Sequence, residues 1–241
     1  MNTIVIYTDL DGSLLDHHNY SHAAADALLE ELETQGIPVI PVSSKTRAEL
    51  LQLRRQLDNR HPFVVENGAA VLIPTGYFKT QPADTESSNG YWVKCFSLPR
   101  SHWLNKIDSV AANFAGEFAN FSNLDVDSIA SMTGLDPAAA QSASAREFGE
   151  PVYWTGSESS RLHFIEALQS IDARVLQGGR FLHVSGECDK GQALRWLNIQ
   201  YANQTGSEQP LSIAIGDSQN DAAMLEAADH ALVIRSPAHP P

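Results

Sequence analysis

Two carboxylates separated by one residue follow the first apolar run of the sequence. Asp9 and Asp11 come directly after Ile4-Val5-Ile6-Tyr7-Thr8, a run typical of a buried strand. Because residues two apart in extended chain point to the same side, we expect the two carboxylates to converge. Such a pair repels unless a cation lies between the groups or one of them is protonated. Both conditions suit phosphoryl transfer, in which Asp9 attacks phosphorus to give an aspartyl phosphate while Asp11 serves as general acid and then base.

A second acidic group follows another apolar run near the end of the chain. Gly216-Asp217-Ser218-Gln219-Asn220-Asp221 comes directly after Leu211-Ser212-Ile213-Ala214-Ile215. If this turn is helical, Asp217 and Asp221 share one face. Together with Asp9 they offer the hard oxygen ligands that Mg²⁺ prefers. We therefore expect a Mg²⁺ site here, where the ion would screen the repulsion between Asp9 and an anionic phosphate.

A transferring phosphoryl group also needs hydrogen-bond donors around its oxygens. Ser43 follows the second apolar run, and Lys190 precedes Gly191 at the predicted start of a helix. Because ligands of open parallel sheets bind at the carboxyl ends of the strands, we expect the Ser43 hydroxyl and the Lys190 ammonium to reach the same crevice. The backbone amides of Leu10 and Asp11 could add further donors.

Each of these signals has a structural alternative. An Asp-x-Asp pair at the end of a strand is by itself more often turn chemistry, and a lysine before glycine or a serine after a strand says less still. The GDSQND stretch is more particular, because a glycine and two spaced acids after an apolar strand are hard to explain as a solvated turn. The order of all four motifs, each placed after a strand or at a helix start, favours an active site.

The elements that must position these residues alternate between strand and helix. Ser21 can cap a helix that carries Ala25, Leu28, Leu29 and Leu32 and ends at Gly36. The apolar run 37–42 follows, then a helix opened by a capping box at 46–49, then the apolar run 63–65. After Lys190 the pattern continues with a helix through Leu194 and Leu197, the strand 211–215, a helix near Met224 and a strand at 231–234. This alternation predicts a doubly wound parallel sheet, an α/β fold.

The middle of the chain has a different pattern. Amphipathic helices are predicted around residues 103–114 and 162–168, with short strands at 91–96, 151–155, 173–177 and 180–185. We therefore predict a Rossmann-like core of residues 1–82 and 186–241, with an α+β cap inserted at 83–185. The linkers near Pro82 and Gly186 would let the cap close over the site.

Composition narrows the possible partners. The chain has 241 residues, 43% of them hydrophobic, and a formal net charge of −13. Such an acidic surface repels phosphate backbones, and we therefore expect no nucleic-acid partner. Any anionic substrate would need a local basic pocket. Cys95 and Cys188 fit neither a disulfide framework nor a zinc site. No apolar run approaches the roughly 20 residues that span a bilayer, and no signal peptide is recognisable, so we expect a cytoplasmic protein outside the membrane. The sequence gives no oligomeric state.

The four motifs also carry a family resemblance. DLDGS, Ser43, Lys190 and GDSQND resemble the motifs of the haloacid dehalogenase superfamily, and the insertion between Ser43 and Lys190 is similar to the Cof-type cap of its sugar phosphatase branch. Within that branch the chain most resembles the mannosyl-3-phosphoglycerate phosphatases. The stretches that carry this closer resemblance are 42–49, 65–70, 146–151, 178–183 and 229–237.

The resemblance implies a Mg²⁺-dependent phosphatase that converts mannosyl-3-phosphoglycerate to the compatible solute mannosylglycerate. It implies that the backbone oxygen of Asp11 joins Asp9, Asp217 and Asp221 as a metal ligand. It also implies that the anionic sugar phosphate is bound by Ser44, Lys45, Glu66, Asn67, Arg146, Arg180 and Asn220. Arginine would suit the substrate carboxylate because its planar fork grips such a group at two points. Structural alternatives remain, since Lys45 could line an exposed helix start and Asn67-Gly68 and Gly178-Gly179 are turn signals.

Several other functions fit parts of this pattern. The substrate could instead be glucosyl-3-phosphoglycerate, sucrose phosphate or another sugar phosphate. A sugar phosphomutase would use Asp9 in the same way but return the phosphoryl group to the sugar. A glycosyltransferase that uses Asp-x-Asp would need a nucleotide-binding unit before that motif, whose first residue here is number 9. A binding protein with a dead site is disfavoured because every catalytic group is present.

Overall fold

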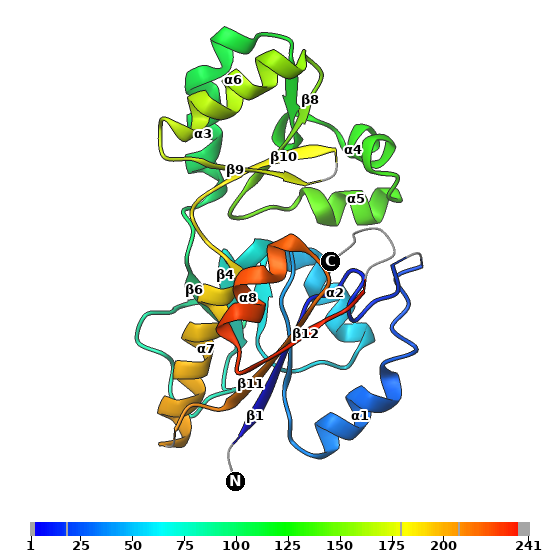
Figure 1. Cartoon of the computed structure of the whole chain (residues 1–241), viewed down its shortest axis with the longest axis vertical. Coiled ribbons are helices and arrows are strands. Elements are labelled where there is room, and N and C mark those ends of the chain that lie inside the picture. The colour runs from blue at the N-terminus through cyan, green and yellow to red at the C-terminus, as the bar shows by residue number, and fades with distance from the viewer. Residues whose placement is uncertain (1–2, 18, 179, 207, 236–241) are drawn as a thin grey trace. The chain divides into compact units, whose positions relative to one another are not determined.

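The computed structural model describes residues 3–17, 19–178, 180–206 and 208–235 (Figure 1). The chain divides into two compact units, which we call the core unit and the inserted unit. The core unit comprises Met1–Ser44, Leu50–Phe96 and Asp189–Pro241, and the inserted unit comprises Lys45–Glu49 and Ser97–Cys188. No helix in the described part of the chain is long and apolar enough to cross a membrane.

A parallel sheet forms the centre of the core unit. Its strands are β1 (Ile4–Thr8), β2 (Val39–Pro41), β11 (Leu211–Gly216) and β12 (His230–Val233), in the order β12-β11-β1-β2. Thr8 is paired with both Pro41 and Ile215, so β1, β2 and β11 reach the same edge of the sheet together. This register places the residues that follow each strand beside one another.

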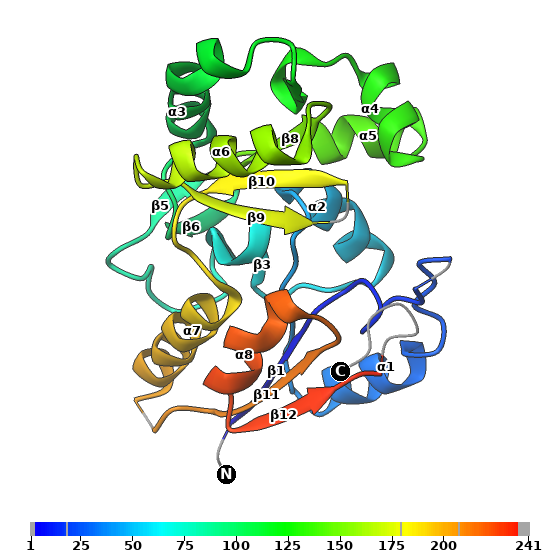
Figure 2. The ribbon, with the colours of Figure 1, turned by 45° about the horizontal axis from the view of Figure 1, so that its top comes forward.

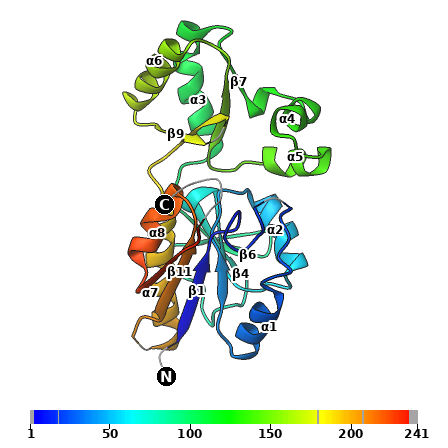
Figure 3. The ribbon, with the colours of Figure 1, turned by 45° about the vertical axis from the view of Figure 1, so that its right-hand side comes forward.

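Helices cover both faces of this sheet. They are α1 (Asp26–Thr34), α2 (Arg47–Gln56), α7 (Lys190–Thr205) and α8 (Ala222–Ala227). Figure 3 shows α1 and α2 on one side of β1 and β11, and α7 and α8 on the other. Leu194 and Leu197 of α7 are buried in one cluster with Val5 and Tyr7 of β1. The doubly wound α/β fold that the sequence predicts is therefore confirmed.

An antiparallel sheet extends the core unit and moves the predicted domain boundary. Its strands are β3 (Phe63–Val65), β4 (Ala70–Pro74), β5 (Glu86–Ser88) and β6 (Tyr91–Cys95), in the order β3-β4-β6-β5. A parallel bridge between Val42 and Val64 joins it to the parallel strands. The strand expected in the cap at 91–96 thus belongs to the core unit, whose second segment continues to Phe96 instead of ending near Pro82. An apolar run indicates a strand but does not indicate the sheet that it joins.

Helix α1 departs from its predicted packing. Its N-cap is Ala25, without a side-chain hydrogen bond, whereas the Ser21 hydroxyl accepts from the nearby Ala23 amide in a local turn. No residue of α1 is buried, and Leu28 is 57% exposed. A hollow of about 360 Å³, lined in part by Leu29, lies beside the helix. The prediction that Ser21 caps this helix is therefore wrong, while Gly36 does adopt the left-handed conformation that follows a helix end (φ +69°).

The inserted unit has an α+β fold, with its own antiparallel sheet and helices. Its strands are β7 (Phe118–Asn120), β8 (Glu150–Trp154), β9 (Arg174–Gly178) and β10 (Phe181–Ser185), paired antiparallel in the order β7-β8-β10-β9. Its helices are α3 (Arg100–Ala111), α4 (Val126–Thr133), α5 (Pro137–Ser144) and α6 (Glu158–Gln169). Figure 2 shows α6 lying along β9 and β10, and Trp103, Phe164 and Leu182 share a buried cluster. The sequence predicted α3, α6, β8, β9 and β10 but not β7, α4 or α5.

Candidate active site

Asp9 is the first residue after β1, and the loop that follows it is tightly folded. The Asp9 amide donates to the Ile215 carbonyl at 2.8 Å, which joins the loop to the neighbouring strand β11. Within the loop, the Leu15 amide donates to the Leu10 carbonyl at 2.8 Å and the Gly12 amide donates to the Leu15 carbonyl at 3.0 Å. These bonds close a short turn that contains Asp11. Both carboxylates of the first motif are therefore carried on a well-defined backbone.

Gly12 allows the first loop to approach the acidic loop after β11. Its φ is +83°, and a Cβ atom built on it would lie 2.5 Å from Asp217 Oδ2. A residue with a side chain here would be strained and would also displace Asp217. The glycine of DLDGS thus brings the Asp217 carboxylate beside the loop that carries Asp9 and Asp11.

Lys190 begins α7 and lies between two carboxylates. The Asp189 side chain caps the helix by accepting from the Gln192 amide at 2.7 Å. This cap fixes the position of Lys190 as the first residue of the helix. Lys190 Nζ donates to Asp9 Oδ1 and to Asp221 Oδ1, both at 2.6 Å, and the Lys190 side chain is fully buried. Burial raises the pKa of Asp9 to about 6; the Lys190 charge opposes this rise and the Asp221 charge adds to it.

Asp221 organises the acidic loop around itself. Its Oδ2 accepts from the amides of Asp217 and Ser218, both at 3.1 Å, and lies 3.2 Å from the Ser218 hydroxyl oxygen. Its Oδ1 accepts from Lys190. One oxygen of the carboxylate is thus committed to the loop and the other is shared with the lysine. This geometry suits a residue that orients the loop and the ammonium more than one that offers both oxygens to an ion.

Three carboxylates of the site could hold a metal ion. Oxygen atoms of Asp9, Asp217 and Asp221 all lie within 4.8 Å of one another. With Lys190 as the one cation bonded to them among the described residues, the ionised cluster carries two net negative charges. A divalent cation with a preference for oxygen ligands fits this set of donors. The structure therefore brings together the three acidic residues that the sequence assigned to a metal site.

Ser43 lies at the end of the neighbouring strand. It is buried, and its amide donates to the Val64 carbonyl at 3.1 Å. Its carbonyl accepts from the Asn67 amide at 2.9 Å. Ser43 thus follows β2 at the same edge of the sheet as Asp9, as the sequence predicted, and Ser44 comes next to it in the chain.

Glu66, Asn67 and Asn220 lie in the core unit. Glu66 is buried in the turn Glu66–Gly68, which directly follows β3. Asn220 Nδ2 donates to Asn67 Oδ1 at 3.1 Å, which joins this turn to the acidic loop. The sequence named both asparagines as separate substrate ligands and gave no sign of their contact. The contact was missed because the two residues are 153 positions apart.

The three cations assigned to the substrate all lie in the inserted unit, as part of residues 45–49 and 97–188. Arg146 lies between α5 and β8, and its charge adds to burial in lowering the pKa of His183 to about 4. Arg180 Nη1 donates to the Met132 carbonyl at 2.9 Å, near the end of α4. Gly179, half of the suggested Gly-Gly turn, lies outside the described residues.

Sequence comparisons identify relatives along nearly the whole chain. Residues 6–88 and 164–237 match the model of the haloacid dehalogenase-like hydrolases. A glucosyl-3-phosphoglycerate/mannosyl-3-phosphoglycerate phosphatase of Methanococcoides burtonii is 34% identical over 97% of this chain and 85% of its own length. A protein of the same name from Persephonella marina is 33% identical over 96% of this chain and 84% of its own length.

A comparison of structures agrees with the fold. A crystal structure of a haloacid dehalogenase-like hydrolase from Bacteroides thetaiotaomicron superposes with a TM-score of 0.65, covering 96% of this chain and 94% of that chain. The two sequences are 16% identical, so this likeness concerns the fold alone.

Proposed function

The chain belongs to the haloacid dehalogenase-like hydrolases and is a phosphoric monoester hydrolase, and from this premise we propose that it dephosphorylates a glycosylated 3-phosphoglycerate. The observation that carries the proposal is the buried Lys190 ammonium, which bonds to Asp9 Oδ1 and Asp221 Oδ1 in a cluster that includes Asp217. This arrangement provides a nucleophile, a cation for the phosphate and an acidic metal site at one edge of the sheet.

Asp9 serves as the nucleophile in the proposed reaction. Its carboxylate attacks phosphorus, the bond from phosphorus to the 3-oxygen of the glycerate breaks, and an aspartyl phosphate forms. Lys190 orients the Asp9 carboxylate through its 2.6 Å bond and offsets part of the charge that the entering phosphate brings. The Ser43 hydroxyl and the loop amides are the proposed donors to the phosphate oxygens.

Asp11 serves as the general acid and base. It protonates the leaving 3-oxygen of the glycerate, then takes a proton from the water that hydrolyses the aspartyl phosphate, so that both residues return to their starting states. The tight turn of the loop holds Asp11 two residues from the nucleophile. Each turnover therefore consumes one water and releases one inorganic phosphate.

Mg²⁺ is the proposed cofactor. Asp9, Asp217 and the backbone oxygen of Asp11 would hold the ion, with Asp221 either as a ligand or as the residue that orients the acidic loop. When bound, Mg²⁺ would withdraw negative charge from the phosphate oxygens and so favour attack by an anion.

The proposed substrate is mannosyl-3-phosphoglycerate, with glucosyl-3-phosphoglycerate as the alternative that the names of both relatives also include. Such a substrate carries a carboxylate besides its phosphate. Lys45, Arg146 and Arg180 supply cations for it in a chain whose net charge is −13. We propose that the inserted unit, as a cap, recognises the glycerate carboxylate of the substrate in this way.

The substrate proposal is tested by phosphate release from a panel of compounds. We expect the highest kcat/KM for mannosyl- or glucosyl-3-phosphoglycerate, well above sucrose phosphate and simple hexose phosphates. A preference for sucrose phosphate or a hexose phosphate would refute the proposed substrate. A phosphomutase would instead isomerise a sugar phosphate and release almost no phosphate.

The mechanism is tested by Asp9→Asn. We expect kcat to fall by about 10³-fold or more, because the amide keeps the shape of the side chain but cannot form the aspartyl phosphate. Asp26→Asn, on the exposed helix α1, is the control and should leave kcat unchanged. Hydrolysis by Asp9→Asn at the wild-type rate would rule out Asp9 as the nucleophile.

A further inference from the structure

The turn Glu66–Gly68 has an unusual backbone. Glu66, Asn67 and Gly68 have φ values of 47°, 60° and 95°, so three consecutive residues adopt left-handed conformations. Two of them are not glycine, and although asparagine tolerates this region, glutamate is unfavourable there. Strain of this kind persists only where the surroundings enforce it, and it clusters at functional sites. The contacts of the turn should therefore show what enforces it.

The turn contacts three separate parts of the candidate site. The Asn67 amide donates to the Ser43 carbonyl at 2.9 Å, and Asn67 Oδ1 accepts from Asn220 Nδ2 at 3.1 Å. Gly68 packs against the peptide that joins Asp189 to Lys190. A Cβ atom built on Gly68 would lie 2.1 Å from the Asp189 carbonyl oxygen and 2.8 Å from the Lys190 nitrogen.

We propose that the turn Glu66–Gly68 is a positioning element that fixes the Ser43 strand end, the start of the Lys190 helix and the Asn220 loop relative to one another. This inference rests on the proposed phosphatase function and assigns the turn a role in it. Asn67 and Asn220 are positioning residues in this assignment, in place of the substrate ligands that the sequence suggested.

A chain of hydrogen bonds extends from the turn to the metal site. Asn220 Oδ1 accepts from the Ser218 hydroxyl at 2.5 Å, and the same hydroxyl lies 3.2 Å from Asp221 Oδ2. Asp221 in turn accepts from Lys190 Nζ. The Asn67 amide group therefore acts on the acidic loop and the lysine through Asn220. Residues in this position around a metal commonly change its affinity by about 10- to 100-fold when they are replaced.

The main experiment replaces Asn67 with glycine. Asn67→Gly removes the side-chain amide but suits the left-handed backbone, so it should not lower the melting temperature. Asn220→Ala removes the other half of the bond. Asn89→Gly is the matched control, because Asn89 also has a positive φ (49°) but lies at the β5–β6 turn. Each variant is assayed with mannosyl-3-phosphoglycerate and with p-nitrophenyl phosphate over a range of Mg²⁺ concentrations.

We expect Asn67→Gly and Asn220→Ala each to lower kcat and to raise the Mg²⁺ concentration for half-maximal activity by about tenfold, equally for both substrates. The double variant should be no worse than Asn220→Ala alone, because that variant already removes the bond to Asn67. Wild-type kinetics in Asn67→Gly, or additive losses in the double variant, would overturn the proposal. A defect confined to KM for the glycosylated substrate would also overturn it, since that result describes a substrate contact.

Two glycines give a second test. Gly68→Ala adds a Cβ atom that collides with the Asp189–Lys190 peptide, whereas Gly76→Ala meets nothing within 4 Å at a similar φ of +84°. Backbone strain is common to both variants, so the difference between them reports the contact with the lysine helix. We expect kcat to fall about tenfold further in Gly68→Ala. Equal kcat values for the two would contradict a positioning role for Gly68.

Failure of the proposed function can be told apart from failure of this inference. Titration calorimetry with Mg²⁺ alone measures metal affinity without any substrate. If the wild type ignores glycosylated 3-phosphoglycerates, the substrate proposal fails, but weaker Mg²⁺ binding by Asn67→Gly than by Asn89→Gly would still support the positioning role. Equal Mg²⁺ affinities for these two variants would overturn it.

Discussion

The Lys190 ammonium lies between two carboxylates in a place that water does not reach. Lys190 and Asp221 are fully buried, and Asp9 is 6% exposed. Removing three charges from water is costly, and only their mutual attraction and good hydrogen-bond geometry offset that cost. The two 2.6 Å bonds supply that geometry. The two carboxylates still exceed the ammonium by one negative charge, which is a reason to expect a cation beside Asp9.

Replacing Lys190 should be far more damaging than replacing a lysine whose ion pair is partly exposed. Lys190→Met keeps the aliphatic stem but leaves Asp9 and Asp221 without their partner, so we expect a loss of about 3–5 kcal/mol in the free energy of unfolding. Urea unfolding in EDTA measures it. Lys94→Ala is the control, because the Lys94–Asp84 pair (2.7 Å) is partly exposed and is expected to contribute about 1 kcal/mol or less. A loss below about 1 kcal/mol for Lys190→Met would contradict the account of the site as a buried ion cluster.

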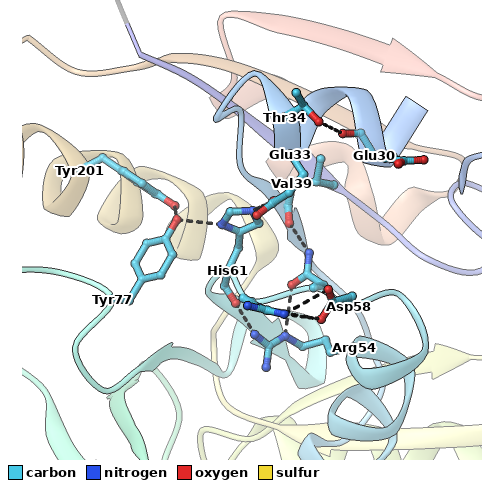
Figure 4. A network of polar contacts seen from close by, with 11 residues as sticks. Glu30, Glu33, Thr34, Val39, Arg54, Asp58, His61, Tyr77 and Tyr201 are labelled. Carbon is cyan, nitrogen blue, oxygen red and sulfur yellow. Dashed lines mark hydrogen bonds and ion pairs between the residues drawn. The ribbon is translucent and has the colours of Figure 1, made fainter. Parts of the chain in front are cut away.

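At the scale of elements, a buried arginine joins the end of α2 to the start of β3 (Figure 4). Arg54 donates to the His61 carbonyl at 2.6 Å and to Asn59 Oδ1 at 3.2 Å. Its guanidinium also lies 4.3 Å from the centre of the Phe63 ring. Burial lowers the pKa of Arg54, although no accessible pH removes its charge. The planar fork thus holds a helix end and a strand start together.

Loss of Arg54 should destabilise the core unit without affecting the chemistry. We expect Arg54→Ala to lower the free energy of unfolding by about 3 kcal/mol, because it removes the buried contacts and leaves the His61 carbonyl short of a donor. Arg54→Lys should restore little of this, since an ammonium cannot reproduce the fork. The exposed neighbour is the control, and Arg55→Ala should stay within about 0.5 kcal/mol of the wild type. Equal stabilities of the Ala variants at 54 and 55 would show that the network contributes nothing.

His183 on β10 should make the stability of the inserted unit depend on pH. Burial, with the Arg146 charge, lowers its pKa to about 4 from 6.5. Above pH 6.5 the histidine is neutral in both states, and as the pH falls to about 4 only the unfolded chain takes up the proton. Stability is therefore lost over this window, by up to about 3 kcal/mol.

The pH effect is measured by urea unfolding between pH 7 and pH 4. We expect His183→Gln to lose less stability over this range than the wild type, because glutamine does not titrate. His163→Gln, on the exposed face of α6, should follow the wild type. Parallel curves for the wild type and His183→Gln would show that His183 is protonated in the folded state as readily as in the unfolded chain.

The sequence allowed the elements of the core to be predicted better than their packing. The carboxyl ends of parallel strands meet at one edge of a sheet, so Asp9, Ser43 and Asp217 could be placed together from their positions after apolar runs. The lysine could be placed because Lys190 precedes Gly191 at the predicted start of a helix. Periodicity alone could not show that β6 pairs with β4, nor that Leu28 faces outward. Both depend on contacts with distant segments.

The finer geometry of the site was not predictable for the same reason. Asn67-Gly68 reads as an ordinary turn, and nothing nearby in sequence indicates Asn220 as its partner. Gly12 and Gly68 are required by the approach of Asp217 and of the Asp189–Lys190 peptide, which are far away in the chain. The chemistry of a site indicates which residue types carry it out. The residues that position these groups can be identified only from the complete fold.

At the scale of the whole molecule, each of the two units buries apolar side chains of its own. The core unit buries Tyr7 and Leu197 in one cluster, and the inserted unit buries Trp103 and Phe164 in another. The four tryptophans are shared equally, with Trp92 and Trp196 in the core unit and Trp103 and Trp154 in the inserted unit. All the acidic residues of the metal site lie in the core unit. Calorimetry should therefore resolve two unfolding transitions, only one of which depends on metal.

Mg²⁺ should raise the melting temperature of the core unit selectively. A ligand that binds only the folded state at 100 times its Kd stabilises by about 2.7 kcal/mol, which for a unit of this size is a shift of roughly 5–10 °C. Asp217→Asn should abolish most of that shift. Of the three carboxylates of the metal site, Asp9 and Asp221 are already bonded to Lys190, so the loss of the Asp217 carboxylate should weaken Mg²⁺ binding strongly. The transition of the inserted unit should not move and so serves as an internal control. Equal shifts in both transitions, or an unchanged shift in Asp217→Asn, would mean that Mg²⁺ binds elsewhere, and the acidic cluster would then have to be explained by its bonds to Lys190 alone.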